Sequence, residues 1–239
     1  MIPVLCAGMI RSGSTLQYQL AAAIVERAGA GERLGWQSES ELERTLEAIR
    51  DEPGFRVVKA HACTPGLAAW ARSGAPVVCV HRDPREVAAS LMRKHGIDLD
   101  ELLSRRWIDG AIAAHEAWTS MPRVLVSRYD DLSRDPVSEA VRIAAFLAPG
   151  LGRPIGRDGI EAIGRDHALE RQHERVGTIR AGAVPVSAAG EVRFGARDLL
   201  HEDHLSGPGE APRLDRGQRR RIVDRFGSWM RSMGYDVDG

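Results

Sequence analysis

Short apolar runs alternate with helical patterns through the first two thirds of the chain, and this alternation constrains the fold more than any other feature of the sequence. Four runs have the length and composition of strands: Val4 to Ala7, Arg56 to Ala60, Pro76 to His81 and Arg123 to Tyr129. Each is apolar on both sides, as expected for a strand that helices cover on both faces. The pattern predicts an α/β fold of three layers, with a central, mainly parallel sheet flanked by helices.

The segments between and after these strands have helical periodicity. We expect helices at about residues 14–28, 39–50, 65–72, 84–94, 99–120, 136–147 and 215–233. The last helix has an arginine-rich face, which we interpret as solvated rather than as RNA-binding. Residues from about 165 to 212 are rich in Gly, Pro, Ser, His and Arg, which predicts long, mobile loops with short helical pieces. No repeat or linker divides the sequence, so we expect residues 1–239 to form a single domain.

Composition excludes several classes of protein. Lys plus Arg and Asp plus Glu both total 33, and a net charge of zero disfavours a general binder of nucleic acid or of membrane surfaces. No apolar run approaches the ~20 residues of a membrane span, and no basic segment of a signal peptide is present. The three cysteines are odd in number, which favours reduced thiols and a cytoplasmic location.

A glycine loop at Gly8–Thr15 follows the first predicted strand and leads into an apolar helix. A strand, a glycine loop and a helix in this order form phosphate sites, where backbone N–H groups and the helix dipole face the anion. Ser14 stands where a nucleoside triphosphate site requires lysine, which disfavours ATP, and Arg11 is the loop's one cation. A plain strand-to-helix turn capped by Ser12 explains the loop alone equally well.

A second candidate anion site follows the third predicted strand. Arg82 ends this strand, and Ser90 lies about two turns along the helix that Pro84 begins. An arginine and a hydroxyl in these positions can converge on one anion. The alternative is a surface ion pair of Arg82 with Asp83 or Glu86.

Lys59 and His61 stand at the end of the second predicted strand. Because the carboxyl ends of parallel strands line the ligand crevice of an open sheet, we expect Arg11, His61 and Arg82 to lie together at the opening of this crevice. The ordinary pKa of histidine lies near working pH, so His61 is suited to the role of general base.

Taken together, these segments resemble the family of sulfotransferases that use 3′-phosphoadenosine-5′-phosphosulfate (PAPS). Ile10-Arg11-Ser12-Gly13-Ser14-Thr15 matches the family's phosphosulfate loop except at its first position, where the family has proline. Arg82 and Ser90 reproduce the arginine and the serine, eight positions apart, that bind the 3′-phosphate. Lys59-Ala60-His61 is similar to the Lys-Thr-His segment that holds the catalytic base of many members.

Two weaker segments follow in the family's order, and the resemblance spans roughly residues 2 to 235. Arg128-Tyr129-Asp130-Asp131-Leu132 resembles the segment whose tyrosine lies against the adenine, and His204-Leu205-Ser206-Gly207 resembles the loop that closes over the 3′-phosphate. Leu16 stands where many members carry the adenine-stacking tryptophan. The family's Arg-Lys-Gly closing loop is absent.

The resemblance implies a P-loop-like sulfotransferase fold and transfer of a sulfuryl group from PAPS to a hydroxyl or amine of a small-molecule acceptor, with PAP as the product. The catalytic residues that it implies are His61 as general base, Arg11 and Lys59. The residues that it implies for donor binding are Arg11, Ser12, Gly13, Ser14, Thr15, Leu16, Arg82, Ser90, Tyr129, His204 and Ser206.

Sulfuryl transfer requires no metal, and we predict no metal site. The nearest candidate ligand set, His201-Glu202-Asp203-His204 with His167 and His173 upstream, we interpret as solvated surface. A P-loop-type small-molecule kinase and a non-catalytic nucleotide-binding protein of the same fold are the alternative functions. No motif identifies the acceptor or an oligomeric state.

Overall fold

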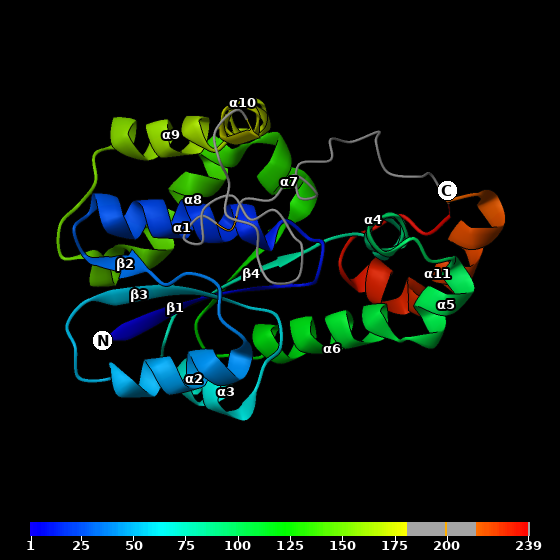
Figure 1. Ribbon diagram of the computed structural model, residues 1–239, viewed down its shortest axis with the longest axis horizontal. Helices are drawn as coiled ribbons and strands as arrows, with labels where there is room; N and C mark the ends of the chain where they lie inside the picture. The colour runs from blue at the N-terminus through cyan, green and yellow to red at the C-terminus, as the bar shows by residue number, and fades with distance from the viewer. Residues whose placement is uncertain (181–198, 200–213, 239) are drawn as a thin grey trace.

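The computed structural model describes residues 1–180, 199 and 214–238 (Figure 1). Its five strands pair in parallel, in the order β2-β3-β1-β4-β5. They are β1 (Ile2–Gly8), β2 (Gly31–Arg33), β3 (Phe55–Ala60), β4 (Val77–His81) and β5 (Val124–Arg128). The parallel sheet of the predicted α/β fold is confirmed. Sequence analysis missed β2, because this half-exposed edge strand of three residues contains no apolar run.

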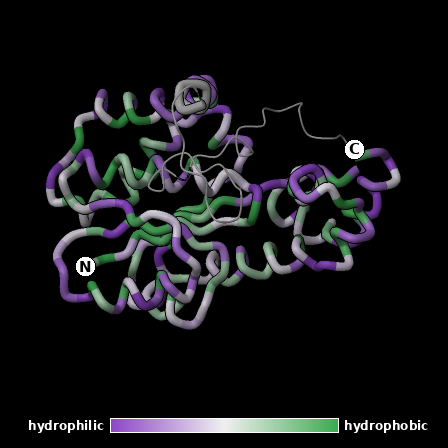
Figure 2. The backbone as a smooth tube through the Cα atoms, viewed as in Figure 1, coloured by the Kyte–Doolittle hydropathy of each residue, from purple (hydrophilic) through white to green (hydrophobic). Residues whose placement is uncertain are grey.

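Helices cover both faces of the sheet (Figure 1). One face carries α1 (Ser14–Arg27), α7 (Tyr129–Arg134), α8 (Pro136–Leu151), α9 (Arg157–Asp166) and α10 (Leu169–Arg180), and the other carries α2 (Glu39–Ala48), α3 (Pro65–Arg72) and α6 (Trp107–Thr119). Side chains of β1 alternate between the two cores: Val4 and Cys6 pack with α1 and α8, whereas Leu5 and Ala7 pack with α2 and α3. The strands therefore form the apolar centre that Figure 2 shows.

A third apolar cluster lies beside the sheet, among α4 (Pro84–His95), α5 (Leu99–Ser104), α6 and α11 (Arg216–Ser232). Helix α4 begins with proline in its first turn, and the Asp83 side chain accepts a hydrogen bond from the Arg85 N–H. It ends at Gly96, whose φ of 62° is left-handed. Sequence signals at both ends thus fix the length of the helix that follows β4.

Three predicted segments differ from the structure. The single helix expected at 99–120 is two helices, because Arg106 has a left-handed φ of 55° and separates α5 from α6. Helix α8 continues past residue 147 to Leu151. Helix α10 forms where we expected loops with short helical pieces: it lacks an apolar period, but its Gln172 is buried and donates to Gln19 Oε1 at 2.8 Å. Residues 181–198 and 200–212 of the predicted loop region lie outside the described residues.

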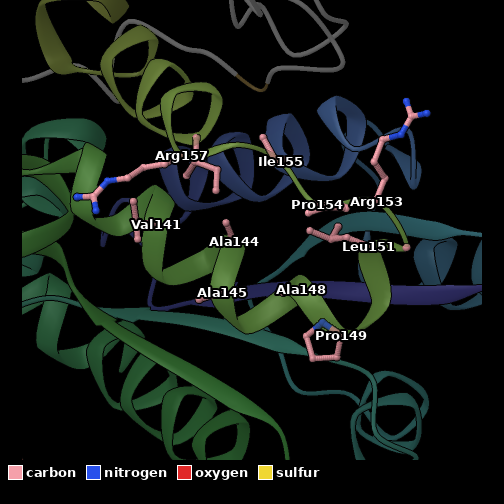
Figure 3. Close-up of a pocket in the computed structure, with 12 residues that line it drawn as sticks. Val141, Ala144, Ala145, Ala148, Pro149, Leu151, Arg153, Pro154, Ile155 and Arg157 are labelled. Carbon is pink, nitrogen blue, oxygen red and sulfur yellow. The ribbon is translucent and has the colours of Figure 1, made fainter.

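An apolar pocket of about 620 Å³ lies between the C-terminal half of α8 and its connection to α9 (Figure 3). The Arg123 side chain, just before β5, donates to the Phe146 carbonyl at 3.2 Å, so this end of α8 lies at the amino ends of the strands. The predicted site residues follow the carboxyl ends of the strands. The pocket is therefore separate from the candidate site. Among the described residues, no helix has the length and apolarity to cross a membrane.

Candidate functional site

The loop between β1 and α1 has a backbone that suits anion binding. Arg11 and Gly13 are both left-handed, with φ of 62° and 83°. A Cβ on Gly13 would lie 2.7 Å from Cδ2 of Tyr129, so glycine is required here both by conformation and by space. In the described part of the chain, the N–H groups of Gly13, Ser14 and Thr15 donate to no carbonyl. These donors lie at the positive end of α1.

Ser12 serves the loop itself. Its buried hydroxyl lies 2.6 Å from the Met9 carbonyl oxygen and 3.2 Å from that of Val80, and its N–H donates to Met9 O. Helix α1 has no side-chain cap, so the interpretation of Ser12 as a helix cap is wrong. The hydroxyl instead ties the loop to β4, which holds the N–H groups of the following residues in place.

Arg11 joins the loop to the second predicted anion site. Its Nε donates to Ser90 Oγ at 2.8 Å, and Nη1 of Arg82 donates to the Arg11 carbonyl at 3.2 Å. Arg82 and Ser90 thus each contact Arg11 rather than each other. The Arg82 guanidinium also lies over the ring of Tyr129, 4.1 Å from its centroid. The loop, the end of β4 and the face of α4 consequently form one continuous surface.

Two acidic residues flank Arg82. Asp83 does not pair with it, because the Asp83 carboxylate accepts from Nη2 of Arg85 at 2.7 Å. Glu86 Oε2 lies 3.4 Å from Nη2 of Arg82, and the Glu86 side chain is half exposed. An exposed contact of this length contributes little energy, which leaves the Arg82 guanidinium available to an anion.

The polar residues that end β3 reach the same loop. Lys59 Nζ donates to Thr15 Oγ1 at 2.8 Å, and Nδ1 of His61 lies 2.9 Å from the Gly8 carbonyl oxygen. A carbonyl only accepts, so Nδ1 of His61 carries the proton and Nε2 is the basic nitrogen. Burial and then the neighbouring Lys59 lower the pKa of His61 to about 4. Burial and then Arg11 lower the pKa of Lys59 to about 8. His61 is therefore neutral at pH 7, beside a cation.

Two residues that sequence analysis did not assign to the site hold the backbone of His61. Trp118 Nε1 donates to the His61 carbonyl at 3.1 Å. Glu39 Oε1 accepts from the N–H groups of His61 and Ala62, each at 3.4 Å. Burial alone would raise the pKa of Glu39, but N–H donors, including these two, lower it below its usual value. The capping box that starts α2 could predict a helix there, but not this contact.

The structure brings Arg11, His61 and Arg82 to one edge of the sheet, as the topology predicts. Leu16 is partly buried and packs against the α1 and α8 core. His204 and Ser206 lie outside the described residues, so their predicted contacts stay predictions.

The histidines of the candidate metal set are divided between described and undescribed residues. His167 is buried rather than solvated, and its Nδ1 lies 2.8 Å from the Ile163 carbonyl oxygen. His173 is exposed, and His201 falls outside the described residues. Within the part that the structure describes, no three His, Cys, Asp or Glu side chains are grouped to hold a metal ion.

Comparisons with known proteins bear on the family and on the fold of this chain. The sequence matches the family model described as "Sulfotransferase domain" over residues 2–170. No curated protein matches the chain.

Among solved structures, mouse sulfotransferase SULT7A1 complexed with PAP aligns over 96% of this chain and 84% of that chain, with 16% identity and a TM-score of 0.63. Retinol dehydratase aligns over 99% of this chain and 82% of its own in two complexes. The complex with retinol and PAP has 16% identity and a TM-score of 0.57, and the complex with androsterone and inactive cofactor PAP has 17% and 0.54. At these identities the likeness establishes a shared fold.

Proposed function

We propose that this chain, which belongs to the sulfotransferase domain family, transfers a sulfuryl group from PAPS to a hydroxyl or amine of a small-molecule acceptor and releases PAP. One observation carries the proposal: Arg11 contacts both Ser90 and Arg82. It thereby joins a second cation to a loop whose N–H groups donate to no carbonyl of the described residues. A donor with two separated anionic groups fits these two sites, the loop and the end of β4. The structural relatives are complexes with PAP, which supports this choice of donor.

The loop suits the 5′-phosphosulfate, and the end of β4 suits the 3′-phosphate. In the first place, the N–H groups of Gly13, Ser14 and Thr15 face the anion. In the second place, Arg82 supplies a positive charge. Ser90 Oγ accepts from Arg11, which leaves its own proton for a phosphate oxygen.

The side chains at the end of β3 supply the chemistry. As the acceptor oxygen or nitrogen forms its bond to sulfur, His61 Nε2 takes the acceptor's proton. The bond from sulfur to the bridging oxygen breaks, and that oxygen keeps the electron pair. Arg11 and Lys59 stabilise the charge that develops there, which is larger in the transition state than before it. Binding of the anionic donor beside Lys59 raises the pKa of His61 toward working pH, because it offsets the lysine's charge.

Ligand-dependent melting tests the donor. At about a hundredfold over its dissociation constant, a ligand adds ~2.7 kcal/mol to the free energy of unfolding, which raises the Tm of a chain of this size by roughly 5–10 °C. We expect this rise with PAP and expect Arg82→Ala to reduce it. A rise with ATP and Mg²⁺ but not with PAP would contradict the proposal and favour a kinase.

Product detection tests the reaction. PAPS is incubated with a panel of alcohols, phenols and amines, and sulfated products are detected by mass. We expect products that depend on His61. Binding of PAP without transfer to any panel member, in wild type and in His61→Ala alike, would instead indicate a non-catalytic nucleotide-binding protein.

A further inference from the structure

Lys94 lies one helical turn beyond Ser90 on α4, so the two side chains share a face of this helix. Because Ser90 Oγ accepts from Arg11 Nε at 2.8 Å, this face looks onto the phosphate loop. Lys94 is exposed, and its ammonium makes no ion pair or hydrogen bond with any residue that the structure describes. It is an uncommitted cation beside the proposed reaction centre.

The charge of Lys94 reaches both functional groups at the end of β3. Burial lowers the pKa of Lys59 most, followed by Arg11 and then Lys94. For His61, burial and Lys59 are the larger causes of the low pKa, and Lys94 lowers it further. Glu39 is the acid whose charge acts on His61, and backbone N–H groups already engage its carboxylate. The surroundings of His61 therefore carry an excess of positive charge.

The rarity of lysine in this chain also draws attention to the surroundings of His61. Of the 33 basic residues, only two are lysines, Lys59 and Lys94, and the other 31 are arginines. Elsewhere the chain uses guanidinium groups, which bind in a planar, two-pronged manner. An ammonium is a compact point charge on a flexible stem. Both lysine ammonium groups lower the pKa of His61.

The proposed donor accounts for three of the cations but not for Lys94. Its phosphosulfate lies at Arg11 and Lys59, and its 3′-phosphate at Arg82. The acceptor must place its attacking atom within hydrogen-bond reach of His61 Nε2, and Lys94 stands on the face of α4 that looks onto the phosphate loop. We propose that Lys94 binds an anionic group of the acceptor, so that the acceptor is a small hydroxyl or amine compound that also carries a carboxylate or a comparable anion. This inference rests on the proposed transfer to an acceptor beside His61.

Matched acceptor pairs test this inference. Each pair is an alcohol or a phenol that carries a carboxylate, such as 3-(4-hydroxyphenyl)propionate, and its neutral methyl amide. Binding to the enzyme–PAP complex is measured by calorimetry, and KM and kcat are measured with PAPS. We expect the carboxylate to bind more tightly in wild type. Lys94→Met raises the KM of the carboxylate by roughly 10–100-fold, the worth of one charge-assisted contact, and leaves that of the amide unchanged.

Two variants serve as controls. Lys94→Arg keeps the charge and restores most of the preference for the carboxylate. Arg153→Met removes one exposed charge next to the distant α8 pocket and leaves the preference as in wild type.

Three results would overturn the inference: no preference for any carboxylate in wild type, equal losses for both members of a pair in Lys94→Met, or a rise in the KM of PAPS instead of the acceptor. Failure of the proposed function is distinguishable from these. It appears as carboxylate binding that depends on Lys94 without any sulfated product.

Discussion

Two histidines stand at the carboxyl ends of β3 and β4, which pair with β1 on its two sides. Burial is the main cause that lowers the pKa of each to about 4. The Nδ1 atom of His61 bonds to the Gly8 carbonyl, and the residue is only partly buried, with Lys59 nearby. The Nδ1 atom of His81 lies 2.8 Å from the Tyr235 hydroxyl, and its ring meets those of His115, Trp229 and Tyr235 edge to face.

Neither position nor pKa distinguishes these two residues. The partners of each ring do: His61 keeps a basic nitrogen toward the proposed acceptor, while aromatic rings enclose His81, which is 7% exposed. A histidine at the end of a parallel strand is therefore suited to proton transfer only when the chain leaves one ring nitrogen accessible.

Alanine at the two positions gives the largest expected difference. We expect His61→Ala to lower kcat by ~10²–10⁴ and to leave the affinity for PAP near that of wild type, because the base is lost and the donor contacts stay. His81→Ala leaves the Tyr235 hydroxyl without its partner, so it lowers Tm but keeps kcat. Steady-state kinetics, calorimetry and melting measure the three quantities. Undiminished turnover in His61→Ala would remove the residue from its proposed role.

The residue after His81 provides a second test, because Arg82 is expected to bind without taking part in proton transfer. Arg82→Ala removes one charge-assisted contact with the 3′-phosphate and weakens donor binding by about one to two orders of magnitude. Titration calorimetry with PAP measures the change. Since Arg82 also donates to the Arg11 carbonyl, melting without ligand controls for damage to the loop. Unchanged PAP affinity would place the 3′-phosphate elsewhere.

The pH dependence of kcat/KM sharpens the comparison. The base must be neutral, so activity falls as pH drops through the pKa of His61, about 4 in the free enzyme. Lys59 must stay charged, so activity also falls as pH rises through its pKa of about 8. We expect Lys59→Arg to remove the alkaline limb and His81→Ala to keep both limbs. An alkaline limb that persists in Lys59→Arg would assign it to another group.

The smallest expected effect concerns stability alone. In the described structure, both ring nitrogens of the buried His115 lack a partner, and burial lowers the pKa of this residue to about 4. The unfolded residue gains a proton below pH 6.5 and the folded one only near 4, so His115 costs more stability as pH falls through this window. We expect His115→Phe to add about 1 kcal/mol at pH 7 and more at pH 5. A lower Tm at both pH values would show that the histidine ring has a partner or fits better than phenylalanine.

Features that depend on local pattern could be predicted from the sequence. The strands β1, β3, β4 and β5 follow from their apolar runs. The proximity of Arg11 and Arg82 follows because each residue comes after a strand of a parallel sheet, whose carboxyl ends lie at one edge. Contacts that depend on distant segments could not be predicted. The inward direction of the Ser12 hydroxyl is set by β4, and the Glu39 carboxylate reaches the end of β3 only because α2 packs beside it. In the sequence, Lys94 looks like an ordinary surface residue. Its place near the loop becomes visible only because α4 packs against that loop.

The bond between Tyr235 and His81 joins residues 154 positions apart. At 5–20 residues per second, a ribosome adds the tyrosine about 8–30 s after the histidine. During that interval the apolar side chains of α4 and α6 that α11 later covers are open to chaperones and to neighbouring nascent chains. We therefore expect substitutions on the inner face of α11 to reduce the yield of folded protein in cells, even where the finished enzyme tolerates them.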